Sequence, residues 1–398
     1  MPNCISDKMF ALTQKNSAVR EMFEEGNRLA KLYGRENVYD FSLGNPNFPA
    51  PARVKDAVID VLNTEPTTMV HGYMSNAGYP DTRKAIAESL NKRFGTAFSE
   101  ANILMSVGAA GGLNVILKTL LNPGDEVLAF APFFLEYGNY VRNYDGELKI
   151  VPPNLPSFQP DPAALEAAVT AKTKAVIINS PNNPTGVIYS EDTLRALGAV
   201  LEKKASEYSH PIFILADEPY RELAYDGAVV PWITKLYRNT VVCYSWSKSL
   251  SLPGERIGYL VIPSEIDDYT LVFDAASIAT RVLGFVNAPS LMQRAVMRCL
   301  DEETDINGYD SNRKKLCDGL RAAGYECAEP QGAFYLWVKT PCDDREFAQT
   351  AKKYNILVVP GTSFACPGYV RIAYCVSAHT IEGALPGFKK LAEEYGLK

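Results

Sequence analysis

The alternation of short apolar runs with longer helical segments constrains the fold of this chain most strongly. Six runs rich in β-branched residues are typical of buried strands: residues 103–107, 126–130, 175–179, 212–216, 241–245 and 257–262. Segments with a helical period, such as 80–94 and 191–208, lie between them. Because the runs are apolar on both faces, they predict a mostly parallel central sheet covered by helices. We therefore predict a large α/β domain over residues 46–290.

The pattern changes after residue 290. Helical stretches over 290–303 and 312–324 precede three strand-like runs, 334–338, 356–360 and 369–374. This succession predicts helices packed on a small sheet. We expect residues 1–45 and 291–398 to form a second, smaller α+β domain, since 398 residues are enough for about two domains.

Composition and charge exclude several classes of protein. Lys plus Arg number 40 against 46 Asp plus Glu, so no cationic field favours nucleic acid. No apolar run has the length of a membrane span, and the first residues lack the pattern of a signal peptide. Eight scattered cysteines without a CxxC pair and only three histidines predict no metal site. We expect a cytoplasmic protein that binds neither nucleic acid nor membrane.

Chemically versatile side chains follow three of the predicted strands. Asn183 follows the run at 175–179, whereas Asp217 and Tyr220 come directly after the next run, and Lys248 and Arg256 follow the run after that. In an open α/β sheet, ligands bind outside the carboxyl ends of the strands. One crevice can therefore collect an amide, an acid, a phenol, an amine and a guanidinium.

Taken singly, each of these residues has an ordinary structural explanation. A lysine after a strand is usually solvated, and an aspartate there is usually a helix N-cap. The whole set, however, suits a pyridine aldehyde with a phosphate tail. Lys248 can form a Schiff base, Asp217 can keep the ring nitrogen protonated, and Arg256 can hold the phosphate.

The chain resembles the fold type I, class I/II pyridoxal-phosphate-dependent aminotransferases, the aspartate aminotransferase family. The resemblance rests on NNPTG, DEPY and SWSKSLSLPGERIGY, with FSLGNPNFPAP near the start and PGTSFACPGYVRIAY near the end. These motifs occur in order over nearly the whole chain, and the ordered set is far more specific than any one of them.

The resemblance implies a role for each residue that matches a cofactor position. Lys248 matches the Schiff-base lysine, Asp217 the partner of the pyridine nitrogen, and Asn183 and Tyr220 the pair that bond the phenolate oxygen. The phosphate positions are matched by Arg256, Ser245 and Ser247, and by the helix start at Gly108, Ala109 and Ala110.

Four further positions are assigned by the same resemblance. Phe134 matches the aromatic residue that stacks on the cofactor ring, although an aromatic side chain there is also compatible with the core. Tyr73 matches a tyrosine that reaches the phosphate of the neighbouring subunit, which implies a homodimer with shared active sites. Arg371 matches the arginine that grips the substrate α-carboxylate, and Gly44 lies close to the same carboxylate.

The implied reaction moves an amino group from an α-amino acid to a 2-oxo acid through pyridoxamine phosphate, with Lys248 as general base and acid. An alternative on the same scaffold is a carbon–sulfur β-lyase or an ACC-synthase-like eliminase. A pyridoxal-phosphate-dependent DNA-binding regulator would need a helix-turn-helix extension, and only about 40 residues precede LGNPNF. A non-catalytic metabolite-binding protein would have no need of Lys248 and Asp217 together.

The sequence departs from the acid-specific members at two places. Ala110 stands where some relatives have a lysine for a second carboxylate. Arg281 lies one residue away from the place of an arginine that other relatives donate from the partner subunit. It is either that arginine after a local shift or a solvated charge at a helix end, and we favour the second interpretation. We therefore expect a broad or neutral-leaning range of amino donors.

Overall fold

The structure of the chain is a computed structural model that describes residues 4–14 and 18–397. The chain divides into two compact units. The smaller unit contains Met1–Asn45, Ser311–Ala328 and Phe334–Lys398, and the larger unit contains Pro46–Asp310 and Glu329–Ala333. Residues 291–310 therefore lie in the larger unit, whereas the sequence pattern put the boundary at 290. The reason is that α12 (Ser290–Met297) packs on α3 (Ala52–Thr64) and α5 (Pro80–Phe94).

The larger unit is built on a seven-stranded sheet of order β2-β8-β7-β6-β5-β3-β4. Only β8 runs antiparallel to its neighbours; the other adjacent pairs are parallel. The strands are β2 (Ile103–Ser106), β3 (Glu126–Phe130), β4 (Glu147–Val151), β5 (Thr173–Asn179), β6 (Phe213–Asp217), β7 (Thr240–Ser245) and β8 (Gly258–Val261). The predicted α/β sheet is confirmed, but β4 had no apolar run to predict it. It is an edge strand in which only Val151 is buried, so its sequence is mixed.

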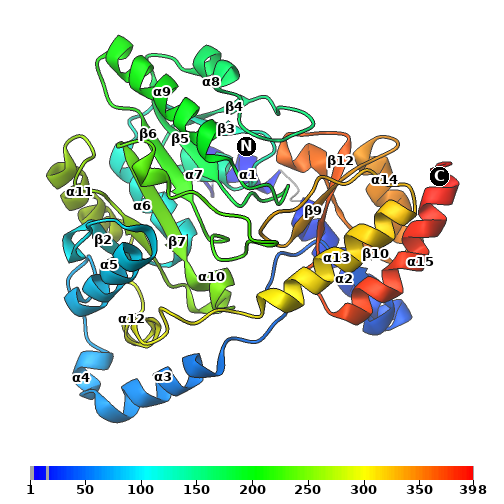
Figure 1. Cartoon of the computed structure of the whole chain (residues 1–398), viewed down its shortest axis with the longest axis horizontal. Coiled ribbons are helices and arrows are strands. Elements are labelled where there is room, and N and C mark those ends of the chain that lie inside the picture. The colour runs from blue at the N-terminus through cyan, green and yellow to red at the C-terminus, as the bar shows by residue number, and fades with distance from the viewer. Residues whose placement is uncertain (1–3, 15–17, 398) are drawn as a thin grey trace. The chain divides into compact units, whose positions relative to one another are not determined.

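Helices cover both faces of this sheet (Figure 1). Besides α3, α5 and α12, the helices of the larger unit are α4 (Thr67–Val70), α6 (Gly108–Leu120), α7 (Tyr137–Asn143), α8 (Pro162–Ala168), α9 (Glu191–Tyr208), α10 (Trp246–Ser249) and α11 (Tyr269–Val282). The helix α9 shows why these segments fold as they do. Ser190 caps its start by accepting from the backbone N–H of Thr193, and Leu194, Leu197 and Leu201 bury one face.

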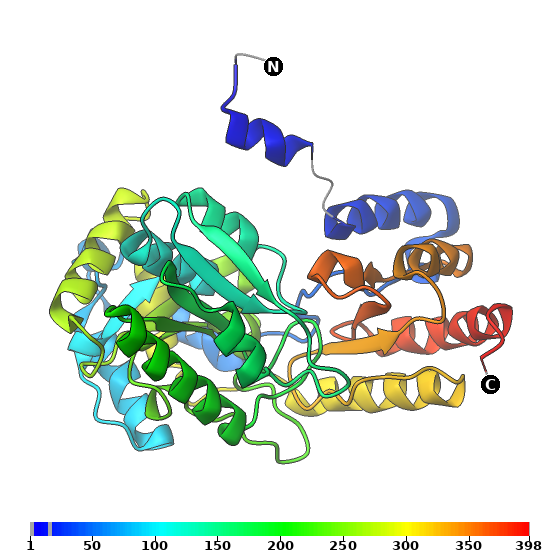
Figure 2. The ribbon, with the colours of Figure 1, turned by 90° about the horizontal axis from the view of Figure 1, so that it is seen from above.

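Among residues 4–14 and 18–397, the smaller unit contains two small sheets, four whole helices and most of a fifth, whose first five residues belong to the larger unit. Strands β1 (Tyr39–Asp40) and β10 (Ile356–Leu357) pair in parallel, and the antiparallel sheet has the order β11 (Val359–Pro360), β12 (Tyr369–Ala373), β9 (Tyr335–Lys339). The helices are α1 (Asp7–Thr13), α2 (Ala18–Tyr33), α13 (Ile306–Ala322), α14 (Asp344–Ala351) and α15 (Ala378–Glu394). In Figure 2, α2 and α13 lie on opposite sides of β9. The apolar run at 356–360 contributes strands to both small sheets, β10 to one and β11 to the other.

A search of the described helices finds none that is long and apolar enough to cross a membrane.

Candidate active site

Strand register brings the predicted site residues to one edge of the large sheet. Asn179 at the end of β5 pairs with Asp217 at the end of β6, and Asp217 pairs with Cys243 of β7. Gly258 at the start of β8 lies between Ser245 of β7 and Ser106 of β2. Because the carboxyl ends of these parallel strands are aligned, the polar residues that follow them share one edge.

Asp217 is a fully buried carboxylate without a basic partner. The hydroxyl of Tyr137 donates to Oδ2 of Asp217 at 2.6 Å, and no ion pair forms between Asp217 and any described residue. Burial raises the pKa of Asp217 to about 7, and the hydrogen bond from Tyr137 opposes part of this rise. The site therefore favours a ligand that brings a positive charge to this carboxylate.

The next residue, Glu218, shows the contrasting arrangement. It is also buried, but Arg221 donates to both its oxygens, at 2.5 and 2.6 Å. Burial raises the pKa of Glu218 and the Arg221 guanidinium pulls it down. The described part of the chain thus supplies a cation to Glu218 and none to Asp217.

Asn179 links two of the predicted site residues. Its side-chain nitrogen donates to the backbone oxygen of Asp217 at 2.8 Å, and its side-chain oxygen accepts from the backbone N–H of Asn183 at 2.6 Å. All three residues are buried. A single amide thereby fixes the end of β6 relative to the loop that follows β5.

Lys248 lies on the short helix α10, directly after β7. It is half-buried, and its Nζ is 6.0 Å from the centre of the Tyr220 ring. The neighbouring motifs DEPY and SWSKSLSLPGERIGY contain Tyr220, Ser245 and Ser247, and all three side chains are buried. The amine therefore projects from a position that packing and the sheet hold firmly.

The start of α6 and Arg256 form a cradle suited to an anion. The N-cap residue Val107 makes no side-chain hydrogen bond to the helix start, so the first amides, at Gly108, Ala109 and Ala110, can donate to an external anion. A Cβ atom at Gly108 would lie 3.2 Å from Nη2 of Arg256, so the guanidinium lies against this helix start. A Cβ atom at Gly258 would lie 3.0 Å from Cα of Gly108, so glycine permits the two backbones to approach.

The other predicted positions differ in their surroundings. Phe134 is half-buried, with its ring edge-to-face to Tyr137 at 5.6 Å between centroids. Tyr73 lies in the larger unit and is 91% exposed. Neither residue is a core side chain, because Phe134 keeps part of its surface accessible and Tyr73 keeps nearly all of it.

Arg371 and Gly44 belong to the smaller unit. Arg371 lies on β12, is 4% exposed, and donates from Nη2 to the backbone oxygen of Ser42 at 2.5 Å. The rings of Tyr335 and Phe364 lie 4.6 and 5.0 Å from its guanidinium carbon. A Cβ atom at Gly44 would lie 2.0 Å from the hydroxyl oxygen of Tyr335, so only glycine fits there. A buried arginine held in this way is prepared for a planar anion.

Sequence reasoning missed Tyr137 and Asn179, although both contact Asp217. Tyr137 ends the segment APFFLEY, in which only Phe134 was singled out. Asn179 is the last residue of a predicted strand, where a polar residue in an otherwise apolar run was the available signal.

Comparison with known proteins extends over nearly the whole chain. Residues 36–387 match the model of the family described as aminotransferase class I and II. A probable aspartate/prephenate aminotransferase of Thermus aquaticus is 32% identical over 358 residues, which are 87% of this chain and 89% of that protein. The crystal structure of an amino transferase from Eubacterium rectale is 46% identical, with a TM-score of 0.97 over 99% of this chain and 100% of that one. The aspartate aminotransferase of Thermus thermophilus, solved with maleate, is 27% identical, with a TM-score of 0.85 over 98% of this chain and 100% of that one.

Proposed function

Because the chain belongs to the class I and II aminotransferases, and is thus a pyridoxal-phosphate-dependent aminotransferase, we propose that its cofactor site lies at the carboxyl ends of β5, β6 and β7. The residues of this strand-end cluster are Asn179, Asn183, Asp217, Tyr220, Ser245, Ser247, Lys248 and Arg256. The environment of Asp217 is the main support for this proposal. A buried carboxylate with no basic partner suits the protonated nitrogen of the pyridine ring. The donor set at the helix start of Gly108 and at Arg256 suits the phosphate.

In this proposal the remaining residues of the cluster hold the other parts of the cofactor. Lys248 binds the cofactor aldehyde, Asn183 and Tyr220 hydrogen-bond the phenolate oxygen, and Phe134 covers one face of the ring. Ser245 and Ser247 join Arg256 and the amides of Gly108, Ala109 and Ala110 around the phosphate. The bound cofactor supplies an electron sink for the bonds of the substrate α-carbon.

The residues of the chain then act on the substrate itself. The substrate amine would take the place of Lys248 at the aldehyde carbon, which would free the Lys248 Nζ to remove the proton from the α-carbon and to return one as general acid. Beside a protonated ring nitrogen, Asp217 would be ionised, and its negative charge would keep the proton on that nitrogen. Arg371 would bind the α-carboxylate of the substrate, and Gly44, beside the hydroxyl of Tyr335, would lie close to the same carboxylate.

The substrates of this enzyme are α-amino acids and 2-oxo acids. Relatives bear names that specify aspartate or prephenate. For this chain we propose a broader, neutral-leaning donor range, since Ala110 offers no charge to a second carboxylate.

We also propose a homodimer with shared active sites, in which Tyr73 serves the phosphate of the partner's site. Its 91% exposure supports this, because a large aromatic side chain that the chain itself leaves in solvent is available for a contact with another chain. We place the enzyme in the cytoplasm, and its eight scattered cysteines, which include no CxxC pair, suit a reducing compartment.

Borohydride reduction of the holoenzyme tests the cofactor site directly. Peptide mapping should find the reduced cofactor on Lys248, and Lys248→Ala should lose nearly all transfer from an amino acid to 2-oxoglutarate or pyruvate. A label on another lysine, or full turnover by Lys248→Ala, would contradict the proposal.

A further inference from the structure

The segment 71–79, between α4 and α5, combines an exposed aromatic side chain with firmly held ends. Tyr73 is 91% exposed, whereas Val70 on one side and Ala77 and Tyr79 on the other are buried. A loop that only connects two helices does not require such an anchor.

Asn287 grips the residues that directly follow Tyr73. Its Nδ2 donates to the backbone oxygens of Met74 and Ser75, at 3.2 and 2.7 Å, and its Oδ1 accepts from the backbone N–H of Met74 at 3.5 Å. Asn76 lies within the segment, and its side-chain nitrogen donates to the backbone oxygen of Val286 at 2.8 Å. Two loops about 210 residues apart in sequence are thus joined by side-chain amides.

Gln293 grips the other end of the segment. It is completely buried; its Oε1 accepts from the backbone N–H of Tyr79 at 3.0 Å, and its Nε2 donates to the backbone oxygen of Ala288 at 2.9 Å. The same nitrogen lies 3.1 Å from the sulfur of Met74. Gln293 therefore ties the segment and the loop of Asn287 to α12.

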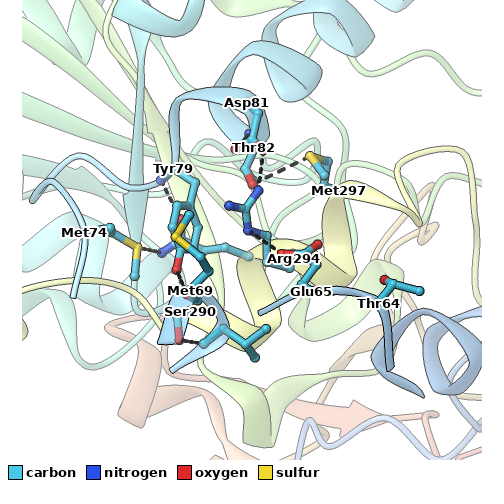
Figure 3. A network of polar contacts seen from close by, with 12 residues as sticks. Thr64, Glu65, Met69, Met74, Tyr79, Asp81, Thr82, Ser290, Arg294 and Met297 are labelled. Atoms are coloured by element: carbon cyan, nitrogen blue, oxygen red, sulfur yellow. Dashed lines mark hydrogen bonds and ion pairs between the residues drawn. The ribbon is translucent and has the colours of Figure 1, made fainter. Parts of the chain in front are cut away.

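A network of ionic and polar contacts fixes the base of the segment 71–79 (Figure 3). Arg294 is buried; it pairs with Asp81, its Nε lies 3.3 Å from Oε2 of Glu65, and its guanidinium lies 3.9 Å from the centre of the Tyr79 ring. Tyr79 donates to the backbone oxygen of Met69. The base of the segment is thereby fixed to α3, α4, α5 and α12.

We propose that Asn287 and Gln293 are positioning residues for Tyr73, and that they act on the active site of a second copy of this chain. The inference rests on the proposed function, in which Tyr73 reaches the partner's phosphate. Holding the segment in the free chain removes the cost of ordering it when the two chains associate. The effect of either residue is therefore predicted to appear in the partner's cofactor site and not in its own.

The first test is the dissociation constant of pyridoxal phosphate for the Asn287→Ala enzyme, measured by visible absorbance. We expect it to rise about tenfold, toward the value for Tyr73→Phe, as for a lost hydrogen bond to a charged group. Asn91→Ala is the matched control. Asn91 is also half-buried and makes three hydrogen bonds to a loop, with Thr96 and Phe98, but it does not touch the segment. The control should lose similar stability and keep its cofactor affinity.

A second measurement separates positioning from a general structural role. If Asn287 acts through Tyr73, Asn287→Ala should have little further effect on cofactor affinity in a Tyr73→Phe background. Equal effects in both backgrounds would overturn the inference. Asn76→Ala, which removes one bond between the same loops, gives a milder variant should Asn287→Ala fail to fold.

Mixed dimers decide which site is affected. In a dimer of Asn287→Ala with Lys248→Ala chains, the site that keeps Lys248 receives Tyr73 from the chain with an intact Asn287. That site should regain wild-type cofactor affinity, read by borohydride trapping on Lys248. The reference mixture is Tyr73→Phe with Lys248→Ala.

The two mixtures distinguish two kinds of failure. If the reference mixture recovers affinity and the Asn287→Ala mixture does not, Asn287 acts within its own chain and the inference is wrong. If the reference mixture does not recover, Tyr73 does not act across subunits and the proposed sharing of sites is wrong as well.

Discussion

The strand-end cluster and the segment 71–79 are positioned by different means. Asp217, Asn179 and Ser245 end neighbouring strands, so the register of the sheet sets their positions to within a hydrogen bond, and burial completes the cluster. Tyr73 lies on a loop that two distant side chains hold, and its own side chain remains exposed. The difference teaches that Asp217, Asn179 and Ser245 are fixed by backbone pairing, whereas the position of Tyr73 depends on side-chain hydrogen bonds that a single substitution can remove.

The largest expected effect comes from Asp217→Asn, which tests the strand-end cluster at its centre. The amide cannot hold a proton on the ring nitrogen, so we expect kcat to fall roughly 10³-fold, as when an electrostatic group aimed at developing charge is lost. Steady-state assays with one amino donor and 2-oxoglutarate measure this. Activity within a factor of about ten of the wild type would contradict the assigned role.

The same variant should gain stability where it loses activity. Because burial raises the pKa of Asp217 from 3.8 to about 7, the folded apoenzyme keeps a proton that the unfolded chain releases in this range. The free energy of unfolding of the wild-type apoenzyme therefore falls as pH rises from about 4 to about 7. Above pH 7, Asp217→Asn apoenzyme should be more stable on the order of a few kcal/mol, measured by urea unfolding. Unchanged stability at pH 8 would show that the carboxylate is compensated without a ligand.

Arg371→Gln extends the comparison to a buried charge in the smaller unit. Like Asp217, Arg371 is buried, but its proposed partner is the substrate and not the cofactor. We expect kcat/KM to fall roughly 10²- to 10³-fold, because the substrate carboxylate loses a bidentate partner. The dissociation constant of pyridoxal phosphate should stay within about twofold of the wild-type value. Loss of the cofactor together with activity would place Arg371 in a different role.

Tyr137→Phe sharpens the comparison within the cluster. The hydrogen bond from Tyr137 lowers the pKa of Asp217, so its removal raises that pKa further and leaves less carboxylate ionised at pH 7. We expect kcat/KM at pH 7 to fall about tenfold, with the acid limb of the pH profile moved to higher pH.

Tyr237→Phe provides the control for this experiment. Tyr237 is a buried tyrosine that donates to the backbone oxygen of Ile212 at 2.7 Å, just before the start of β6, while Tyr137 bonds to the last residue of the same strand. The control should lose stability without moving the pH profile. A profile that moves equally in both variants would assign the shift to general loosening of β6.

Most of the large unit was predictable from sequence, because buried parallel strands are continuous apolar runs and turn motifs follow them. The edge strand β4 was not predicted, because its sequence has mixed polarity. The end of α12 at Met297 was not predicted either, because the apolar pattern of the sequence continues beyond that residue. In the site, motifs predicted Lys248 and Asp217 as cofactor residues. The contacts of Tyr137 with Asp217 and of Asn287 with Met74 join residues 80 and 213 positions apart, and no local pattern contains them.

The smallest expected effect is that of Arg281→Ala, and it tests whether a second outward-directed residue accompanies Tyr73. Arg281 is exposed in the last turn of α11, where a positive charge interacts favourably with the helix dipole, and it forms no ion pair within residues 4–14 and 18–397. The segment 71–79 is held by hydrogen bonds from Asn287 and Gln293, whereas the side chain of Arg281 has no such bond among the described residues. We therefore expect turnover of aspartate and of a neutral amino acid to change by less than about threefold each, with Arg281→Lys as the charge-preserving control. A selective loss of aspartate turnover by roughly a hundredfold would mean that Arg281 meets the second carboxylate of the substrate from across the dimer, and it would replace the neutral-leaning range with an aspartate-specific one.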